Sequence, residues 1–150
     1  MLPKVLFPEL SYKITGLCFQ VHNELGHFAK EKQYADRFEQ LLKDNNIEYE
    51  REIKIPFQLE EREVSGNIAD FLIENKIILE CKAKRIIARD DYHQVQRYLK
   101  ATDKQLGIIV NFHERYLKPK RILNYQIRYQ STNKKLYQST NPFESTNRYS

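Results

Sequence analysis

Cysteine is scarce in this chain, and long apolar runs are missing. The two cysteines, Cys18 and Cys81, lie far apart, and no Cys-x-x-Cys pair occurs. Two thiols do not make a disulfide framework, so we expect a protein of the reducing cytoplasm. No apolar run approaches the roughly 18 residues that cross a bilayer, and the N-terminus lacks the apolar core of a signal peptide. These absences argue against membrane-spanning and disulfide-stapled classes of protein.

Length and composition are those of one globular domain. The chain has 150 residues, of which 41% are hydrophobic, enough for a single core. It carries 25 basic and 20 acidic residues, and the net charge of +5 favours a polyanionic partner such as nucleic acid. The sequence Tyr-Gln-Ser-Thr-Asn at 129–133 recurs at 137–141. This low complexity predicts a disordered tail at 130–150 behind a domain spanning 1–129.

Apolar spacing along the chain predicts an α/β fold. Side chains that recur every three or four residues indicate helices at 9–25, 29–44 and 90–103. Extended patterns indicate strands at 47–59, 64–73, 77–82 and 106–112, with a polar turn at 60–63 and room for a short strand within 118–129. The α-α-β-β-β-α-β order predicts a mixed sheet of about four or five strands flanked by helices.

One segment of this pattern carries the candidate chemistry. Asp70 is followed by nine residues and then by Glu80-Cys81-Lys82. Apolar runs on both sides of the polar trio 74–76 predict two strands joined by a tight turn. A three-residue loop would place Asp70 across from Glu80, with Cβ atoms roughly 4.5–5.5 Å apart, and Lys82 on the same face. Two carboxylates so placed repel each other, which favours a divalent cation such as Mg²⁺ between them.

Two alternatives to this interpretation stay open. Alternating charge on a strand usually marks only its solvated face. Here, however, the strands are apolar on both faces, as buried strands are, and a buried charge is costly unless it is paired or bound to metal. The second alternative is a different register. A two-residue loop at 75–76 would pair Asp70 with Cys81 and send Glu80 to the opposite face.

Further candidates lie outside these strands. Gln94 and Tyr98 are four apart and share one face of a predicted helix. Cys18 and His22 have a spacing that can bind zinc, but no second ligand pair stands out. The basic segment 118–121, with Arg115 and Tyr116 just before it, could bind phosphates or form a solvated rim.

Taken together, these residues resemble a known group. Asp70 with Glu80-Cys81-Lys82 resembles the PD-(D/E)xK nuclease signature, and Gln94-x-x-x-Tyr98 resembles the accessory motif of the helicase-nuclease and phage exonuclease branch. Residues 10–124 resemble the small bacterial GxxExxY proteins. The similar stretches are 21–26, Glu31-x-x-Tyr34, 69–71, 98–102 and 110–112. Two positions depart from the patterns: Phe28 replaces the first glycine of the name-giving motif, and Ala69 replaces the leading proline of the signature.

The resemblance implies a restriction-endonuclease-like core and phosphodiester cleavage that depends on Mg²⁺ or Mn²⁺, with DNA favoured over RNA as substrate. It implies that Asp70 and Glu80 hold the ion, with the backbone carbonyl of Cys81 as a third ligand. Lys82 would orient the attacking water and offset negative charge that grows on phosphorus.

The resemblance also assigns supporting roles. Glu31 would complete the metal shell directly or through water, and Gln94 and Tyr98 would position the phosphate or the Glu80 side of the site. Each has a plainer alternative, because Glu31 can be a solvated helix charge and Tyr34 and Tyr98 can be core residues. At the level of function, the alternative to a nuclease is a non-catalytic module on the same fold that binds nucleic acid or another protein.

Overall fold

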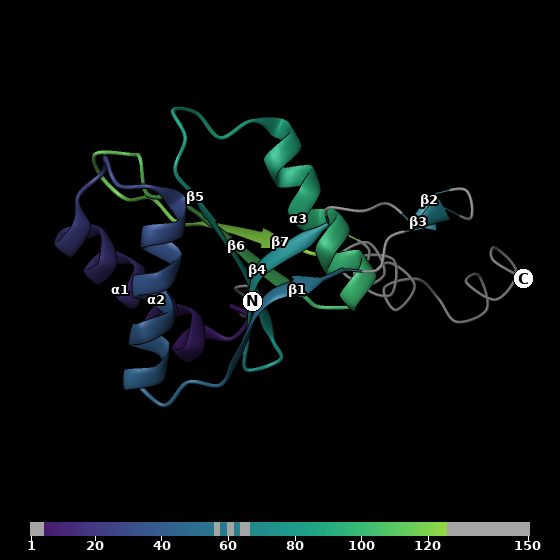
Figure 1. Cartoon of the computed structure of the whole chain (residues 1–150). Coiled ribbons are helices and arrows are strands. Elements are labelled where there is room, and N and C mark those ends of the chain that lie inside the picture. The colour runs from purple at the N-terminus through teal and green to yellow at the C-terminus, as the bar shows by residue number, and fades with distance from the viewer. Residues whose placement is uncertain (1–4, 56–57, 60–61, 64–66, 126–150) are drawn as a thin grey trace, which may run out of the picture.

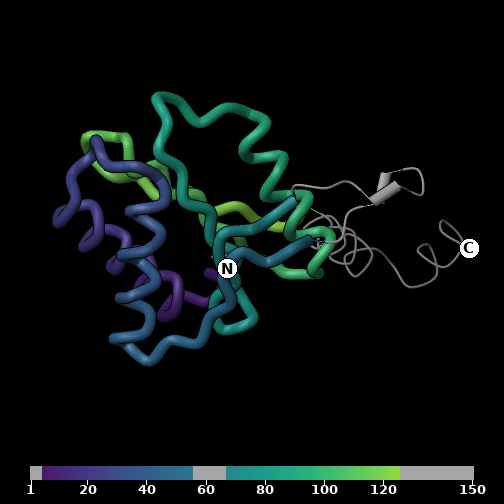
Figure 2. Tube along the Cα trace, viewed as in Figure 1, coloured from purple at the N-terminus to yellow at the C-terminus, as the bar shows by residue number. Residues whose placement is uncertain are grey.

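Helices cover both faces of a central sheet (Figure 1). The structure is a computed structural model, which describes residues 5–55, 58–59, 62–63 and 67–125, and Figure 2 traces the same path as a tube. The expected tail at 130–150 lies outside the described residues. Within the described part, no helix is long and apolar enough to cross a membrane.

The sheet has five strands in the order β1-β4-β5-β6-β7. Their bounds are Tyr49–Lys54 for β1, Ile68–Ile73 for β4, Ile77–Lys82 for β5, Leu106–Asn111 for β6 and Lys120–Leu123 for β7. Neighbouring strands are antiparallel except β5 and β6, which are parallel and are joined through helix α3, Arg89–Thr102. A parallel pair requires such a crossover. The predicted mixed sheet is confirmed, and the short strand expected within 118–129 is β7.

Two details of the predicted pattern are wrong. The extended segment 47–59 is not one strand, because β2 (Gln58–Leu59) pairs with β3 (Arg62–Glu63) in a separate two-stranded sheet. Residues 62–63, expected in a turn, therefore pair as a strand, since a hairpin needs only two turn residues. Pro56 cannot donate a ladder hydrogen bond, which explains why β1 ends before it.

The helices begin and end close to the expected positions. Helix α1 spans Pro8–Leu25, and α2 spans Glu31–Asp44, two residues later than expected at its start. The backbone N–H of Lys30 donates to the side-chain oxygen of Gln33 at 2.8 Å, and this capping bond fixes the beginning of α2. Because Glu31 is then the first residue of the helix, its carboxylate lies at the positive end of the helix dipole.

Two apolar cores lie on the two faces of the sheet. The core on the α1 and α2 face contains Val21, Phe38, Phe71, Leu79 and Val110 among others. The core on the α3 face contains Leu72, Ile78, Val95, Leu99, Ile109 and Ile122 among others. Helix α3 packs so closely on β6 that a Cβ atom on Gly107 would lie 2.5 Å from Val95 Cγ1. Glycine at this position therefore allows α3 to lie against the sheet.

Candidate active site

The turn between β4 and β5 sets the register of the candidate residues. The pairs Ile73–Ile77 and Phe71–Leu79 lie across from each other, as a three-residue loop at 74–76 predicts. The Lys76 N–H donates to the Ile73 carbonyl at 3.0 Å and closes a four-residue turn. Glu74 and Asn75, its two central residues, have positive φ values of 49° and 55°, as a type I′ turn requires. The alternative register with a two-residue loop is excluded.

The strand beside β4 carries a backbone irregularity at Glu52. Its φ is 54°, in the left-handed region that is rare for residues other than glycine. Alternate residues of a regular strand share one face. Here the Arg51 guanidinium lies over the Phe71 ring on the α1 and α2 side, whereas Ile53 packs in the core on the α3 side. Glu52 therefore marks a twist at which β1 exchanges its faces.

The same exchange occurs on β4 at Asp70. Phe71 belongs to the core under α1 and α2, while Ala69 belongs to the core under α3. Glu52 and Asp70 are not paired in the β1–β4 ladder. The β4–β5 ladder ends at Phe71–Leu79, the pair next to Asp70. The twist thus takes Asp70 out of regular strand pairing and frees its backbone N–H for another acceptor.

That acceptor is the carboxyl group of Glu80. The Asp70 N–H donates to Glu80 Oε1 at 2.9 Å, and the Cys81 N–H donates to Asp70 Oδ2 at 2.7 Å. Each carboxyl group therefore reaches across to the backbone of the opposite strand. Glu80 is 2% exposed and Asp70 is half-buried, so two adjacent acidic side chains lie largely out of solvent. This adjacency agrees with the predicted facing of the two residues.

Burial and mutual repulsion change how the pair ionises. Burial raises the pKa of Asp70, and the hydrogen bond from Cys81 and the charge of Lys82 offset only part of this effect. Burial, followed by the charge of Asp70, raises the pKa of Glu80 to about 8. Two carboxylates in contact cannot both ionise at ordinary cost, so the pair retains a proton near neutral pH.

Lys82 is the cation beside this pair. Its Nζ lies 3.8 Å from Glu80 Oε2 and 3.9 Å from Asp91 Oδ1, and it donates to Gln94 Oε1 at 3.2 Å. Asp91 and Gln94 are three apart on α3, so one face of that helix holds the lysine from above the sheet. The structure therefore brings together Asp70, Glu80, Lys82 and Gln94, as the sequence interpretation expected.

Asp91 and Lys84 are part of this cluster and were not among the sequence candidates. Lys84 Nζ donates to Asp91 Oδ2 at 2.7 Å, and the Ala88 N–H donates to the same oxygen at 2.8 Å. Burial acts to raise the pKa of Asp91, but these bonds outweigh it and lower the pKa. Asp91 is thus an ionised anchor between two lysines. Its spacing of three residues from Gln94 was the sequence signal that could have found it.

Asn111 is a second residue that the sequence analysis did not place. Its side chain exchanges two hydrogen bonds with the backbone of Lys84, accepting from the N–H at 3.1 Å and donating to the carbonyl at 2.7 Å. It is 3% exposed. Asn111 therefore fixes the chain just beyond β5, where Lys82 leaves the sheet. The stretch 110–112 was part of the resemblance to GxxExxY proteins, but the contact with Lys84 could not be expected from the local pattern, because Lys84 is 27 residues away.

Glu31 lies within electrostatic reach of the site from α2. Its side chain is exposed to solvent, yet protein atoms crowd its carboxyl group, and this burial raises its pKa. The charge of Asp70 adds to that effect, while Lys82 and Lys84 oppose it. Tyr34, one turn further on, is fully buried and stacks on Phe112 with ring centroids 4.5 Å apart. Tyr34 is a core residue.

Tyr98 also lies in the core. It is 1% exposed, and its hydroxyl donates to the Ile68 carbonyl at 3.2 Å. Burial, and then the charges of Glu80 and Asp70, raise its pKa to about 12. Tyr98 is therefore a neutral hydrogen-bond donor that ties α3 to the start of β4, close to the carboxyl pair. Its expected role in positioning the phosphate or the Glu80 side of the site stays a prediction.

The two cysteines, His22 and the residues before the basic segment lie in surroundings of their own. Burial strongly raises the pKa of the Cys18 thiol, and His22 Nε2 bonds the Glu114 carbonyl at 2.8 Å. A neutral, enclosed thiol is a poor zinc ligand. The side chain of Cys81 is also fully buried, so the expected ligand at that position is its carbonyl and not its sulfur. In the basic segment, Arg115 lies over the Tyr116 ring at 5.4 Å.

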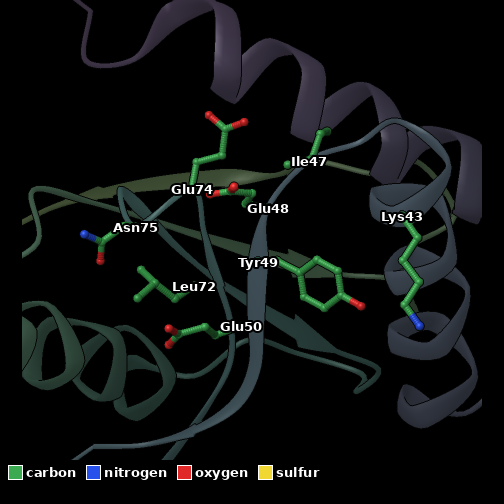
Figure 3. A pocket seen from close by; sticks show the side chains of 8 residues that line it. All are labelled: Lys43, Ile47, Glu48, Tyr49, Glu50, Leu72, Glu74 and Asn75. Atoms are coloured by element: carbon green, nitrogen blue, oxygen red, sulfur yellow. The ribbon is translucent and has the colours of Figure 1, made fainter.

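A cavity of about 540 Å³ lies at the opposite end of β4 and is unrelated to the carboxyl pair. Figure 3 shows its lining, which includes Glu48, Glu50 and Glu74 on neighbouring strand ends and Lys43 from α2. The acidic side chains here are spread around an open space. Neither Asp70 nor Glu80 lines this cavity.

The donor set at the pair suits a hard divalent cation. Among the described residues, no three His, Cys, Asp or Glu side chains gather closely enough to hold a metal alone. Mg²⁺ does not need such a cage, since it usually takes one or two carboxylates and completes its shell with water and substrate phosphate. Asp70 and Glu80 supply two carboxyl groups, and a cation would offset the repulsion that a retained proton now offsets.

A comparison with known families agrees with the fold. Residues 8–122 match the family model described as the PD-(D/E)XK nuclease superfamily, and the chain therefore belongs to that superfamily. Its members are generally nucleases, and the mixed five-stranded sheet with flanking helices is the restriction-endonuclease-like arrangement. No curated protein and no solved structure matches the chain. The narrower resemblance to GxxExxY proteins stays a prediction.

Proposed function

We propose that this protein is a divalent-cation-dependent nuclease whose active centre is Asp70, Glu80 and Lys82. The observation that carries the proposal is the pairing of the buried Glu80 carboxyl group with the half-buried Asp70 carboxyl group, with a lysine Nζ 3.8 Å from Glu80. Ionisable groups placed together in this way are costly to remove from water in a merely structural role. Strongly perturbed titratable groups cluster at functional sites for this reason.

Each residue has a distinct task in the proposed reaction. Asp70 and Glu80 hold Mg²⁺ or Mn²⁺, with the Cys81 carbonyl and, directly or through water, Glu31 as further ligands. When bound there, such an ion polarises the phosphate and lowers the pKa of a coordinated water. Lys82 stabilises the negative charge that develops on the phosphoryl oxygens.

The groups around Lys82 keep it in place for that task. Gln94 accepts a hydrogen bond from its Nζ, and the Asp91 carboxylate lies on its other side. The ammonium group thereby has a fixed position before substrate binds, which avoids the cost of ordering it during the reaction. Tyr98 supports the same helix from below through its bond to Ile68.

A non-catalytic module that binds nucleic acid is the second candidate. The observation that supports it is a groove between α3 and β7 that is lined by the exposed cations Arg89 and Lys120. Such a module gains nothing from a buried pair of acidic side chains next to a lysine, so the nuclease is the better account of the centre. We further propose GxxExxY membership, a single domain at 1–129 and a reducing cytoplasmic setting, the last because Cys18 and Cys81 are both unpaired.

A cleavage assay tests the proposed function. Purified protein is incubated with single- and double-stranded DNA and with RNA, in Mg²⁺ or Mn²⁺ and in chelator, beside the variants Asp70→Asn and Glu80→Gln. We expect cleavage of at least one substrate, most readily DNA, with loss of activity in chelator and in both variants. Glu50→Gln, an exposed strand carboxylate, is the matched control. Variants that cut at the wild-type rate, or a wild type inert on every substrate with both ions, would contradict the proposal.

A further inference from the structure

A second cavity lies between α3 and β7 and has a volume of about 500 Å³. Arg89, His93, Lys120 and Arg121 contribute to its lining, and none of the described residues that line it is acidic. This composition is opposite to that of the cavity at the other end of β4, where three glutamates face one lysine. The groove between α3 and β7 therefore presents positive charge to an anionic partner.

The sheet register puts this groove level with the carboxyl pair. Glu80 lies across from Ile109, and Ile109 lies across from Lys120. Two strand spacings of about 4.8 Å separate the backbones of Glu80 and Lys120, a distance of roughly 10 Å. Paired residues point to one face of a sheet, and Ile109 belongs to the core under α3. Lys120 therefore projects on the face that carries the candidate centre.

The two outermost cations of the groove are available for a ligand. Arg89, in the first turn of α3, and Lys120, at the start of β7, are both exposed. Neither makes a salt bridge or a side-chain hydrogen bond within the part of the chain that the structure describes. The guanidinium of Arg121, in contrast, is held by Ser11 Oγ at 2.7 Å and the Leu6 carbonyl at 2.8 Å. Arg89 and Lys120 are thus the cations that a phosphate would meet.

The far end of the groove carries an exposed aromatic ring. Tyr125 is 65% exposed, and Tyr92 lines the groove from α3. Gln96 fixes the approach of the chain, because its side chain donates to the Leu123 carbonyl at 2.6 Å and accepts from the Tyr125 N–H at 3.2 Å. Basic side chains that track a backbone, together with a ring on which a base can stack, are the elements of single-strand binding.

We infer that the groove between α3 and β7 binds a single-stranded segment of the nucleic-acid substrate next to the cleaved bond. This inference rests on the proposed nuclease function. Arg89 and Lys120 contact backbone phosphates, and Tyr125 stacks on a base. Because Lys120 lies two strands away from Glu80, the phosphates bound in the groove lie within a few nucleotides of the one that is cut.

Strand binding in chelator tests the groove without requiring cleavage. The affinity of a labelled single-stranded DNA is measured by fluorescence anisotropy at several salt concentrations, for wild type and for the double variant Arg89→Ala with Lys120→Ala. We expect binding on the order of tenfold weaker, and a salt-dependence slope smaller by about 1.4, since each lost phosphate contact removes about 0.7. Tyr125→Ala should weaken binding about fivefold or more through the lost stacking.

The matched control is a pair of lysines outside the groove. Lys43→Ala with Lys13→Ala removes the same charge from α2 and α1, so it should change affinity and slope much less. Equal effects of the two double variants, or groove variants that weaken only duplex binding, would overturn the inference. Normal strand binding by the groove variants together with cleavage lost in Glu80→Gln would refute the groove alone. Groove-dependent binding by a wild type that never cleaves would refute the nuclease alone.

Discussion

At its hairpin end β4 pairs regularly with both neighbours, whereas at Asp70 the ladder with β1 is interrupted and the ladder with β5 has ended. Both ends carry acidic side chains. At the hairpin end, Glu48, Glu50 and Glu74 surround an open cavity of about 540 Å³. At the other end, the half-buried Asp70 and the buried Glu80 lie next to each other, and each accepts a hydrogen bond from a backbone N–H of the opposite strand.

The difference between the two ends comes from the backbone and not from the number of carboxylates. At the hairpin end, backbone N–H groups are used in the regular strand ladders, and the acidic side chains face the open cavity. The twist at Glu52 releases the N–H of Asp70, which then holds a carboxyl group inside the fold. Concentrated, buried charge of this kind needs a cation or a proton. This comparison supports placing the proposed centre at the carboxyl pair and not at the open cavity.

Removing the cation beside the carboxyl pair should give a large change in rate. We expect Lys82→Ala to lower cleavage roughly 10²–10⁴-fold, the range for a positioned proton-transfer or charge-stabilising group, while divalent-cation affinity stays close to wild type. Lys43→Ala, at the hairpin-end cavity, is the control and should leave the rate unchanged. Single-turnover kinetics with calorimetry of cation binding provides both numbers. An unchanged rate in Lys82→Ala would make the lysine a structural charge.

The coupled pair should also make stability depend on pH when no divalent cation is present. The pKa of Glu80 rises from 4.5 in the unfolded chain to about 8 in the fold, so the folded state binds more protons between these values. The free energy of unfolding should therefore fall as pH rises through that window, by at most about 1.4 kcal/mol per pH unit for this group.

Glu80→Gln should remove most of this slope, because an amide does not ionise. Urea unfolding in chelator at a series of pH values measures how the free energy of unfolding depends on pH. Glu50→Gln at the hairpin end serves as the control and should keep the wild-type slope. If Glu80→Gln and the wild type lose stability equally with rising pH, the carboxyl pair is not the source of the dependence.

The twist at Glu52 should matter more than its side chain. A β-branched residue is disfavoured at positive φ, so Glu52→Val should lower the free energy of unfolding by about 1–3 kcal/mol. Glu52→Gly should change it by less than about 1 kcal/mol. Glu50→Val, two residues earlier in the same strand, should have an effect of about 0.5 kcal/mol or less. Similar costs for valine at positions 50 and 52 would show that the twist is not required.

The smallest effect is expected at the hairpin-end cavity. Changing Glu48, Glu50 and Glu74 to glutamine together should leave the cleavage rate within about twofold, since exposed surface substitutions away from a site have little effect. The measurement is the nucleic-acid cleavage assay, run beside the wild type. A large loss of activity in this triple variant would mean that the hairpin-end cavity takes part in the reaction.

Much of the fold could be predicted from local patterns. The helices and the central strands follow from apolar periodicity, which is strong because both faces of the sheet are buried. The register at Ile73–Ile77 follows from the length of the polar loop. The second, two-stranded sheet was missed because its strands have two residues each and carry no periodicity.

The site was predictable where its residues are close in sequence or repeat at helical spacing. Asp70, Glu80, Lys82 and Gln94 were found in this way. Asn111 was not, because it contacts Lys84 across 27 residues. The positive φ of Glu52 was also invisible, since glutamate has no special tendency to adopt it and the surrounding sheet imposes it. Tertiary structure decided these features.

A calorimetric titration with Mg²⁺ tests the central claim most directly. It is carried out with wild type, Asp70→Asn and Glu50→Gln, at a pH above the value of about 8 at which Glu80 ionises. If Asp70 and Glu80 hold the ion, wild type and Glu50→Gln bind one Mg²⁺ with equal affinity and Asp70→Asn does not bind it. Equal Mg²⁺ binding by Asp70→Asn and wild type would contradict the account.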